Sequence, residues 1–68
     1  MFYMILTVNG DRIVSDAGTV EELLSELKIE PARVAVEVNL TVIKKAAYAT
    51  FRLNGGDAVE IVNFVGGG

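Results

Sequence analysis

The sequence contains no cysteine, no histidine and only one proline among its 68 residues. Without thiols there is no disulfide bond and no thiolate zinc site, and Cys/His nucleophile pairs are excluded as well. A chain of this length lies near the lower size limit for a core that holds without such cross-links. With 51% hydrophobic residues, we expect one domain held together by apolar packing, without a metal site.

Long apolar runs are also missing. None approaches the ~20 residues that span a bilayer, and no signal-peptide pattern leads the chain. We therefore expect a soluble cytoplasmic protein with no membrane partner. Six basic against nine acidic residues give a net charge of −3. A net negative charge disfavours nucleic-acid binding and favours partner proteins with basic surfaces.

The first elements are predicted by turn chemistry. Met4 to Val8 is a short β-rich run, and Asn9-Gly10 follows it. Asn-Gly is the strongest short-range hairpin signal, because both central residues of a type I′ turn need positive φ. Arg12 to Ser15 is then the returning strand.

A capping box predicts where the helix begins. Thr19 would accept from the amide of Glu22, whose carboxylate would reach back to the Thr19 amide. The predicted helix runs from about Val20 to Lys28, and Pro31 prevents its continuation. Its apolar face consists of Val20, Leu23, Leu24 and Leu27, and its wet face of Glu21, Glu22, Ser25 and Glu26.

The second half of the chain returns to strands. Val34 to Val38 alternates apolar and other residues, which is typical of a strand with one covered face. Thr41 to Ile43 is a shorter strand, and Ala58 to Phe64 is the last. We interpret Lys44 to Leu53 as a turn-rich crossover that places three side chains in the core: Tyr48, Phe51 and Leu53.

The predicted order β-β-α-β-β-β gives an α+β fold, a mixed β-sheet wrapped around one main helix, as in the ubiquitin-like β-grasp. The first and last strands are expected to be parallel neighbours in the middle of the sheet, since a long crossover separates them. We predict a single domain over residues 1–65 and a flexible glycine tail over 66–68, because glycine runs cannot pack.

Catalytic chemistry is not visible in the sequence. The helix glutamates lie where capping and solvation place acids, and Asp11, Asp16 and Asp57 lie at turns. The stretch from Asn54 to Asp57 is a tight turn rather than a phosphate cradle, because no helix N-terminus follows it. Lys44 and Lys45 are interpreted as a solvated bend, and docking of an acidic partner is the alternative.

The last strand is the candidate site. Val59 and Ile61 share one face, and Glu60, Val62 and Phe64 share the other. If the first pair packs on the helix, Val62 and Phe64 face solvent. Two such apolar residues next to a flexible tail favour a docking patch over burial under a loop.

Together the Asn9-Gly10 turn, the helix start at 19–24, "VAVEVN" and "GDAVEIVNFVGGG" resemble the ThiS family. These are sulfur carrier proteins of thiamine (thiazole) biosynthesis in the ubiquitin-like β-grasp superfamily. The resemblance covers the chain from Met4. Two features depart from it: many relatives have Pro before a basic residue where this chain has Lys44-Lys45, and Met1 to Tyr3 precede the usual start, so Met1 and Met4 both remain candidate initiators.

The resemblance implies a co-substrate rather than an enzyme. Gly68 would be adenylated with ATP and Mg²⁺ by an E1-like activating enzyme of the ThiF/MoeB type and converted to a thiocarboxylate. The sulfur would come from a cysteine desulfurase or another donor and pass to thiazole synthase (ThiG). Gly66 and Gly67 would thread the partner active sites, while Val62, Phe64 and Val65 would dock. No cofactor would be bound permanently, and the free form would be a monomer.

Three alternatives remain open. The small subunit of molybdopterin synthase (MoaD-like) is similar in fold and tail. A ubiquitin-like modifier would be joined to lysines of target proteins. A β-grasp interaction or RNA-binding module would need no free terminus, and the acidic balance counts against it.

Overall fold

The computed structural model describes residues 3–64. The elements in chain order are β1 Met4–Val8, β2 Asp11–Ser15, α1 Val20–Glu26, the 3₁₀ helix η1 Pro31–Arg33, β3 Val34–Val38, β4 Thr41–Ile43, the 3₁₀ helix η2 Lys45–Ala47 and β5 Ala58–Asn63. The strands form one five-stranded sheet in the order β2-β1-β5-β3-β4. The pair β1 and β5 is parallel, and the other neighbours are antiparallel. The predicted mixed sheet with its central last strand is confirmed.

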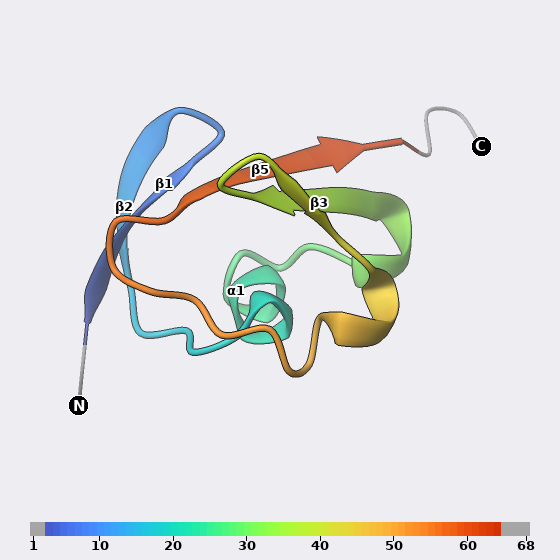
Figure 1. The fold of residues 1–68 in the computed structure, drawn as a ribbon, viewed down its shortest axis with the longest axis horizontal. Helices are drawn as coiled ribbons and strands as arrows, with labels where there is room; N and C mark the ends of the chain where they lie inside the picture. Colours follow the sequence, from blue (N-terminus) through green and yellow to red (C-terminus); the bar gives the residue numbers. More distant parts are fainter. Residues whose placement is uncertain (1–2, 65–68) are drawn as a thin grey trace.

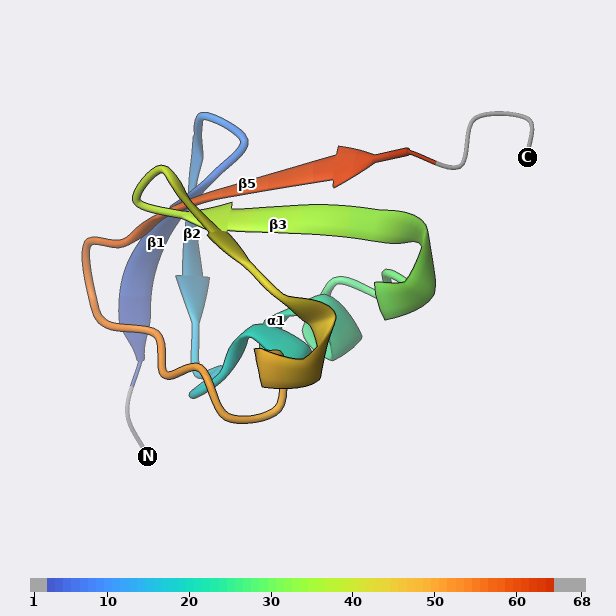
Figure 2. The ribbon, with the colours of Figure 1, turned by 45° about the vertical axis from the view of Figure 1, so that its right-hand side comes forward.

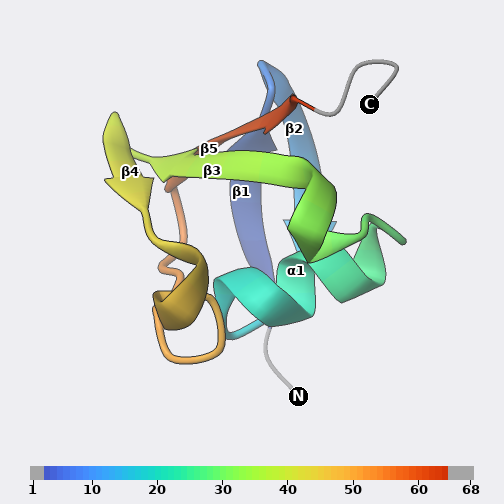
Figure 3. The same cartoon turned by 90° about the vertical axis from the view of Figure 1, so that its right-hand side faces the viewer.

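Helix α1 lies against one face of the sheet, and both 3₁₀ helices lie on that same side (Figure 1, Figure 3). The described part of the chain places no helix on the opposite face. β5 runs beside β3 and extends past the β1–β2 hairpin toward one edge of the molecule (Figure 2). The last strand therefore leads the chain outward from the middle of the sheet.

The core lies between α1 and the sheet. Leu6, Val20, Leu23, Leu24, Val36 and Val59 are fully buried there. Leu27, predicted to belong to the same helix face, is only partly buried. Because side chains alternate along a strand, this arrangement turns the intervening residues of β3 and β5 to the uncovered face.

The helix begins as predicted, with one correction. The Thr19 hydroxyl accepts from the Glu22 amide at 3.2 Å. The Glu22 carboxylate, however, accepts from the Gly18 amide at 2.6 Å and not from Thr19. The next two amides are bound from outside the helix: Val20 donates to the carbonyl of Phe51 and Glu21 to that of Tyr48. Amides at a helix N-terminus lack partners within the helix, and here the crossover supplies them.

The predicted end of the helix at Lys28 is wrong, because α1 ends at Glu26. Lys28 has a φ of 61° and its amide donates to Ser25, while the amide of Ile29 donates to Leu24. This is a Schellman ending, in which a left-handed residue turns the chain back. The turn returns Ile29 to the edge of the core, where it packs partly buried.

The crossover over Lys44 to Leu53 is confirmed as turn-rich, with η2 as its regular part. Tyr48 and Leu53 are buried as predicted, whereas Phe51 is only half-buried. β5 ends at Asn63, one residue before the predicted end. Phe64 nevertheless continues the backbone pairing, since its amide donates to the carbonyl of Arg33 at 3.2 Å.

Candidate functional site

The site is the end of β5, where the chain leaves the sheet. On one side, β3 holds it in antiparallel register, with Ala35 opposite Val62 and Val34 opposite Asn63. The Phe64–Arg33 hydrogen bond extends this pairing past the strand. The backbone is thus fixed in direction up to Phe64.

On the other side, β1 is too short to follow β5 to its end. Backbone pairing reaches only Val8 and Val59, and the Asn9 amide then donates to the Val59 carbonyl at 2.9 Å. The Asn9 side chain continues the ladder by binding Ile61. Its Oδ1 accepts from the Ile61 amide at 2.7 Å, and its Nδ2 donates to the Ile61 carbonyl at 3.2 Å. The side chain of a turn residue therefore supplies the two hydrogen bonds that the backbone of another strand residue would otherwise make.

The opposite turn holds the beginning of β5 in a similar way. The Asn39 side-chain oxygen accepts from the Ala58 amide at 3.0 Å, and its nitrogen donates to the Asp57 carboxylate at 3.0 Å. Asn39 and its neighbour Leu40 both have positive φ, 51° and 69°, the geometry of a type I′ hairpin turn. Two asparagines thus bind the backbone of β5 from turns on either side.

The predicted division of the faces of β5 is confirmed. Val59 is buried and Ile61 is partly buried against the core. Val62 and Phe64 are 54% and 55% exposed. Their exposure is compatible with docking, but docking itself stays a prediction.

Lys44 and Lys45 are both exposed, as a solvated bend requires, but Lys45 also makes specific contacts that this interpretation did not include. Its ammonium group donates to the Val34 carbonyl at 2.9 Å and lies 4.7 Å from the centroid of the Phe64 ring. The Tyr48 hydroxyl donates to the same carbonyl at 3.4 Å, and burial raises the pKa of this hydroxyl above its usual 10.0. Tyr48 therefore stays protonated and remains a donor at neutral pH.

The remaining predicted site residues, Val65, Gly66, Gly67 and Gly68, lie outside the described residues. Sequence reasoning missed Asn9 and Lys45 as parts of this site. The Asn-Gly pair signals the turn but not the partner of its side chain. For Lys45 no local signal exists, because its contacts depend on how β3, η2 and β5 pack.

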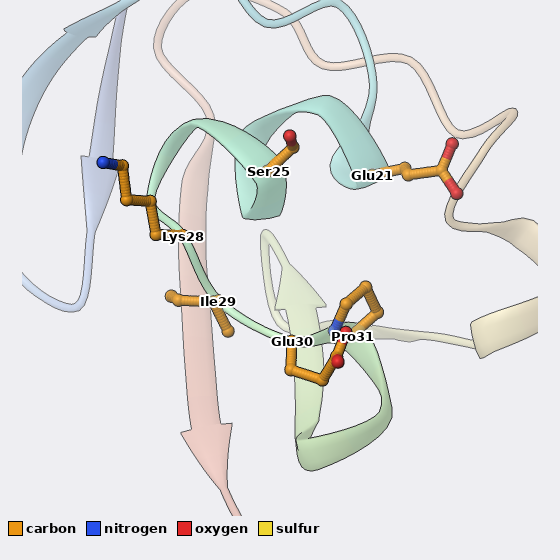
Figure 4. A pocket seen from close by; sticks show the side chains of 6 residues that line it. All are labelled: Glu21, Ser25, Lys28, Ile29, Glu30 and Pro31. Atoms are coloured by element: carbon orange, nitrogen blue, oxygen red, sulfur yellow. The ribbon is translucent and has the colours of Figure 1, made fainter.

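A separate surface depression of about 390 Å³ lies between α1 and η1 and is lined by Glu21, Ser25, Lys28, Ile29, Glu30 and Pro31. Its charged side chains do not converge: Glu21 and Lys28 point away from each other at opposite ends of it (Figure 4). Among residues 3–64 no group of three or more His, Cys, Asp or Glu side chains could hold a metal ion. The same residues include no helix long and apolar enough to cross a membrane.

The sequence model of the ThiS family matches residues 5–68. The chain belongs to the ThiS family. A crystal structure of the thiamine biosynthesis protein ThiS from Geobacter metallireducens superimposes with a TM-score of 0.82 at 42% identity, covering 96% of this chain and all of that one. The β-grasp fold is thereby established by a solved relative as well as by the topology.

Two relatives place the family in context. The sulfur carrier protein ThiS of Bacillus subtilis is 39% identical over 66 residues, which are 94% of this chain and 100% of that protein. A thiazole synthase of Paramagnetospirillum magneticum is 48% identical over 66 residues, 96% of this chain. The chain spans only 20% of the length of that synthase. It therefore corresponds to one segment of a longer protein in that case and to a whole protein in the other.

Proposed function

We propose that this chain is a sulfur carrier for thiamine biosynthesis and that it carries the sulfur on the carboxyl group of Gly68. The observation that supports this most directly is the match to the ThiS family, which extends through all three terminal glycines. The sulfur carrier ThiS of Bacillus subtilis corresponds to this chain over its full length. Membership of the same family favours the thiamine pathway over the molybdopterin and protein-modifier alternatives.

The chemistry explains why a carrier needs activation. A carboxylate is ionised at neutral pH, and its charge repels nucleophiles. In the proposed cycle, a Gly68 carboxylate oxygen attacks the α-phosphorus of ATP on an E1-like enzyme, giving an acyl adenylate and pyrophosphate. A hydrosulfide ion then attacks the acyl carbon, the bond from that carbon to the AMP oxygen breaks, the S–H proton is released to water and a thiocarboxylate remains. ATP and Mg²⁺ are used by the activating enzyme, and the carrier is a co-substrate.

The fold supports such a role through the end of β5. The C-terminal end must enter a partner's active site, and the folded domain must therefore bind that partner in one defined orientation. Backbone pairing up to Phe64 and the Asn9–Ile61 hydrogen bonds fix the starting direction of that reach. Glycines without Cβ atoms suit a narrow channel. The exposed side chains of Val62 and Phe64 supply apolar area beside it, with Val65 proposed to add to it.

Thiazole synthase is the proposed acceptor of the sulfur. Thiazole synthases of Paramagnetospirillum magneticum and Magnetococcus marinus each contain a segment similar to this chain. Two units on one polypeptide meet at high effective concentration, which suits a carrier and its acceptor. The E1-like enzyme and a sulfur donor such as a cysteine desulfurase complete the proposed set of partners.

The test is the intact mass of the 68-residue chain, with a free Gly68 carboxylate, after incubation with a ThiF-type activating enzyme, MgATP and sulfide. We expect one oxygen to be replaced by one sulfur, and only when ATP is present. Fragmentation should place the sulfur on Gly68. A chain of unchanged mass, or sulfur at another position, would contradict the proposal.

A further inference from the structure

Lys45 is exposed, yet its ammonium group has a defined position. It lies between the Val34 carbonyl, at 2.9 Å, and the Phe64 ring, at 4.7 Å from the centroid. It is also 5.9 Å from the centroid of the Tyr48 ring. A cation within about 6 Å of an aromatic centroid is attracted by the ring quadrupole. Lys45, on η2, thus contacts Phe64, the residue directly after β5.

The Lys45 ammonium group can bind there because β4 does not pair with β3 along its whole length. β4 pairs with β3 only as far as Val36, which lies opposite Ile43. The carbonyl of Val34 lies beyond that pairing, and Lys45 and Tyr48 donate to it instead. Since the Tyr48 hydroxyl also donates there, the carbonyl keeps a partner when Lys45 is replaced. The ammonium group is therefore dispensable for satisfying the backbone, but it alone lies over Phe64 within residues 3–64.

We propose that Lys45 is a positioning residue for sulfur loading: it holds the Phe64 ring in the orientation that the activating enzyme binds. The proposal rests on the proposed function of Gly68. Phe64 is 55% exposed, so its side chain has room for other rotamers. Its backbone is fixed by Arg33, and Lys45 selects among the positions of the ring. A preorganised aromatic residue binds more tightly because less entropy is lost on docking.

The expected effect is a change in binding rather than in chemistry. An exposed cation–π pair changes the equilibrium between two side-chain rotamers by a factor of about two to five. Lys45→Gln should therefore raise the KM for the carrier about two- to fivefold and leave kcat unchanged. Lys45→Arg should restore the wild-type KM, since a guanidinium group also stacks on aromatic faces. Lys44→Gln is the matched control, because it makes the same charge change at the adjacent exposed residue.

A double-mutant cycle separates positioning from direct contact with the enzyme. Phe64→Leu removes the ring and keeps apolar bulk. If Lys45 acts through Phe64, Lys45→Gln has no further effect on KM in the Phe64→Leu background. An effect that persists there, or an equal effect from Lys44→Gln, would overturn the proposal. An unchanged KM for Lys45→Gln would overturn it too.

NMR of the free chain provides a readout that needs no partner. In the wild type, the ε-methylene protons of Lys45 should be shifted upfield by the Phe64 ring, and the shift should vanish in Phe64→Leu. The Phe64 χ1 rotamer that faces Lys45 should be more populated in the wild type than in Lys45→Gln, with the equilibrium between rotamers shifted by about two- to fivefold. If the wild-type chain acquires no sulfur, the proposed function fails, and these spectra test the positioning of the ring by themselves. Equal χ1 populations in the two proteins overturn the positioning role, and a lower population of the Lys45-facing rotamer in the variant supports it.

Discussion

The side chain of Asn9 binds both backbone groups of Ile61, accepting from its amide at 2.7 Å and donating to its carbonyl at 3.2 Å. One residue thus forms the hairpin turn after β1 and also extends the pairing of β5. Its φ of 49° is tolerated by asparagine and glycine better than by other residues. The turn and the support of β5 can therefore be separated by mutation.

Asn9→Gly should keep the turn and lose the support. Glycine adopts the positive φ freely but has no amide group to offer Ile61. We expect faster hydrogen exchange at the Ile61 amide and a free energy of unfolding lower by about 0.5–1.5 kcal/mol. Asn39→Gly is the control, since it should speed exchange at Ala58 instead. Faster exchange at the same amides in both variants would show that the effect is global loosening.

Leu24→Ala should strongly destabilise the domain. Leu24 is 0% exposed, and truncating a buried leucine costs about 2–5 kcal/mol of unfolding free energy. In a domain this small, that is a large part of the total. Denaturant unfolding measures it, with Ser25→Ala on the exposed helix face as control and expected within about 0.5 kcal/mol of the wild type. Equal stability of both variants would contradict the packing described for α1.

Phe64→Ala should weaken partner binding and leave the fold intact. Truncating an aromatic side chain at the centre of an interface costs more than about 1 kcal/mol, or about fivefold in Kd. The exposed Val14 on β2 gives the control, because Val14→Ala removes apolar surface far from the end of β5. Calorimetric titration with a ThiF-type activating enzyme measures both. The docking prediction fails if the two variants bind alike, or if Phe64→Ala unfolds.

The length of the C-terminal glycine segment, residues 66–68, should matter for sulfur loading. Deleting Gly68 draws the terminal carboxylate back by up to about 3.6 Å, and appending alanine moves it past its place and adds a Cβ atom. We expect both changes to abolish thiocarboxylate formation while thermal stability stays within a few tenths of a kcal/mol. Intact mass after loading is the measurement. Equal loading of either variant would refute the role of Gly68.

Stability should fall at high pH through Tyr48. Burial raises the pKa of its hydroxyl above 10.0 in the folded chain, so the folded state holds a proton that the unfolded state releases first. This contribution is complete below the unfolded pKa of about 10 and is lost as pH rises through the folded pKa. Melting temperatures between about pH 9 and 12 should fall more steeply for the wild type than for Tyr48→Phe. Parallel curves would contradict the assignment.

The parts of the fold that the sequence determined are those with local causes. Asn9-Gly10 required a turn, Thr19 required a helix start, and the alternation from Val34 to Val38 required a strand with one covered face. The central place of β5 was predicted for a different reason: the long crossover permits parallel pairing with β1, although the pairing itself joins distant residues. The division of β5 into a packed face and an exposed face was predictable from its period of two.

The remaining features depend on contacts between residues far apart in the chain. The Asn9–Ile61 hydrogen bonds exist because β1 ends where β5 continues, and the Lys45–Phe64 contact exists because β4 stops short of Val34. Shifting the register of β1 on β5, or of β4 on β3, by one residue would change the corresponding contact without altering any local signal. The helix stopped at Glu26 because turning the chain at Lys28 returns Ile29 to the core. Local sequence signals predict the turns, helix and strands, but the packing of strands distant in sequence determines which side chains are in contact.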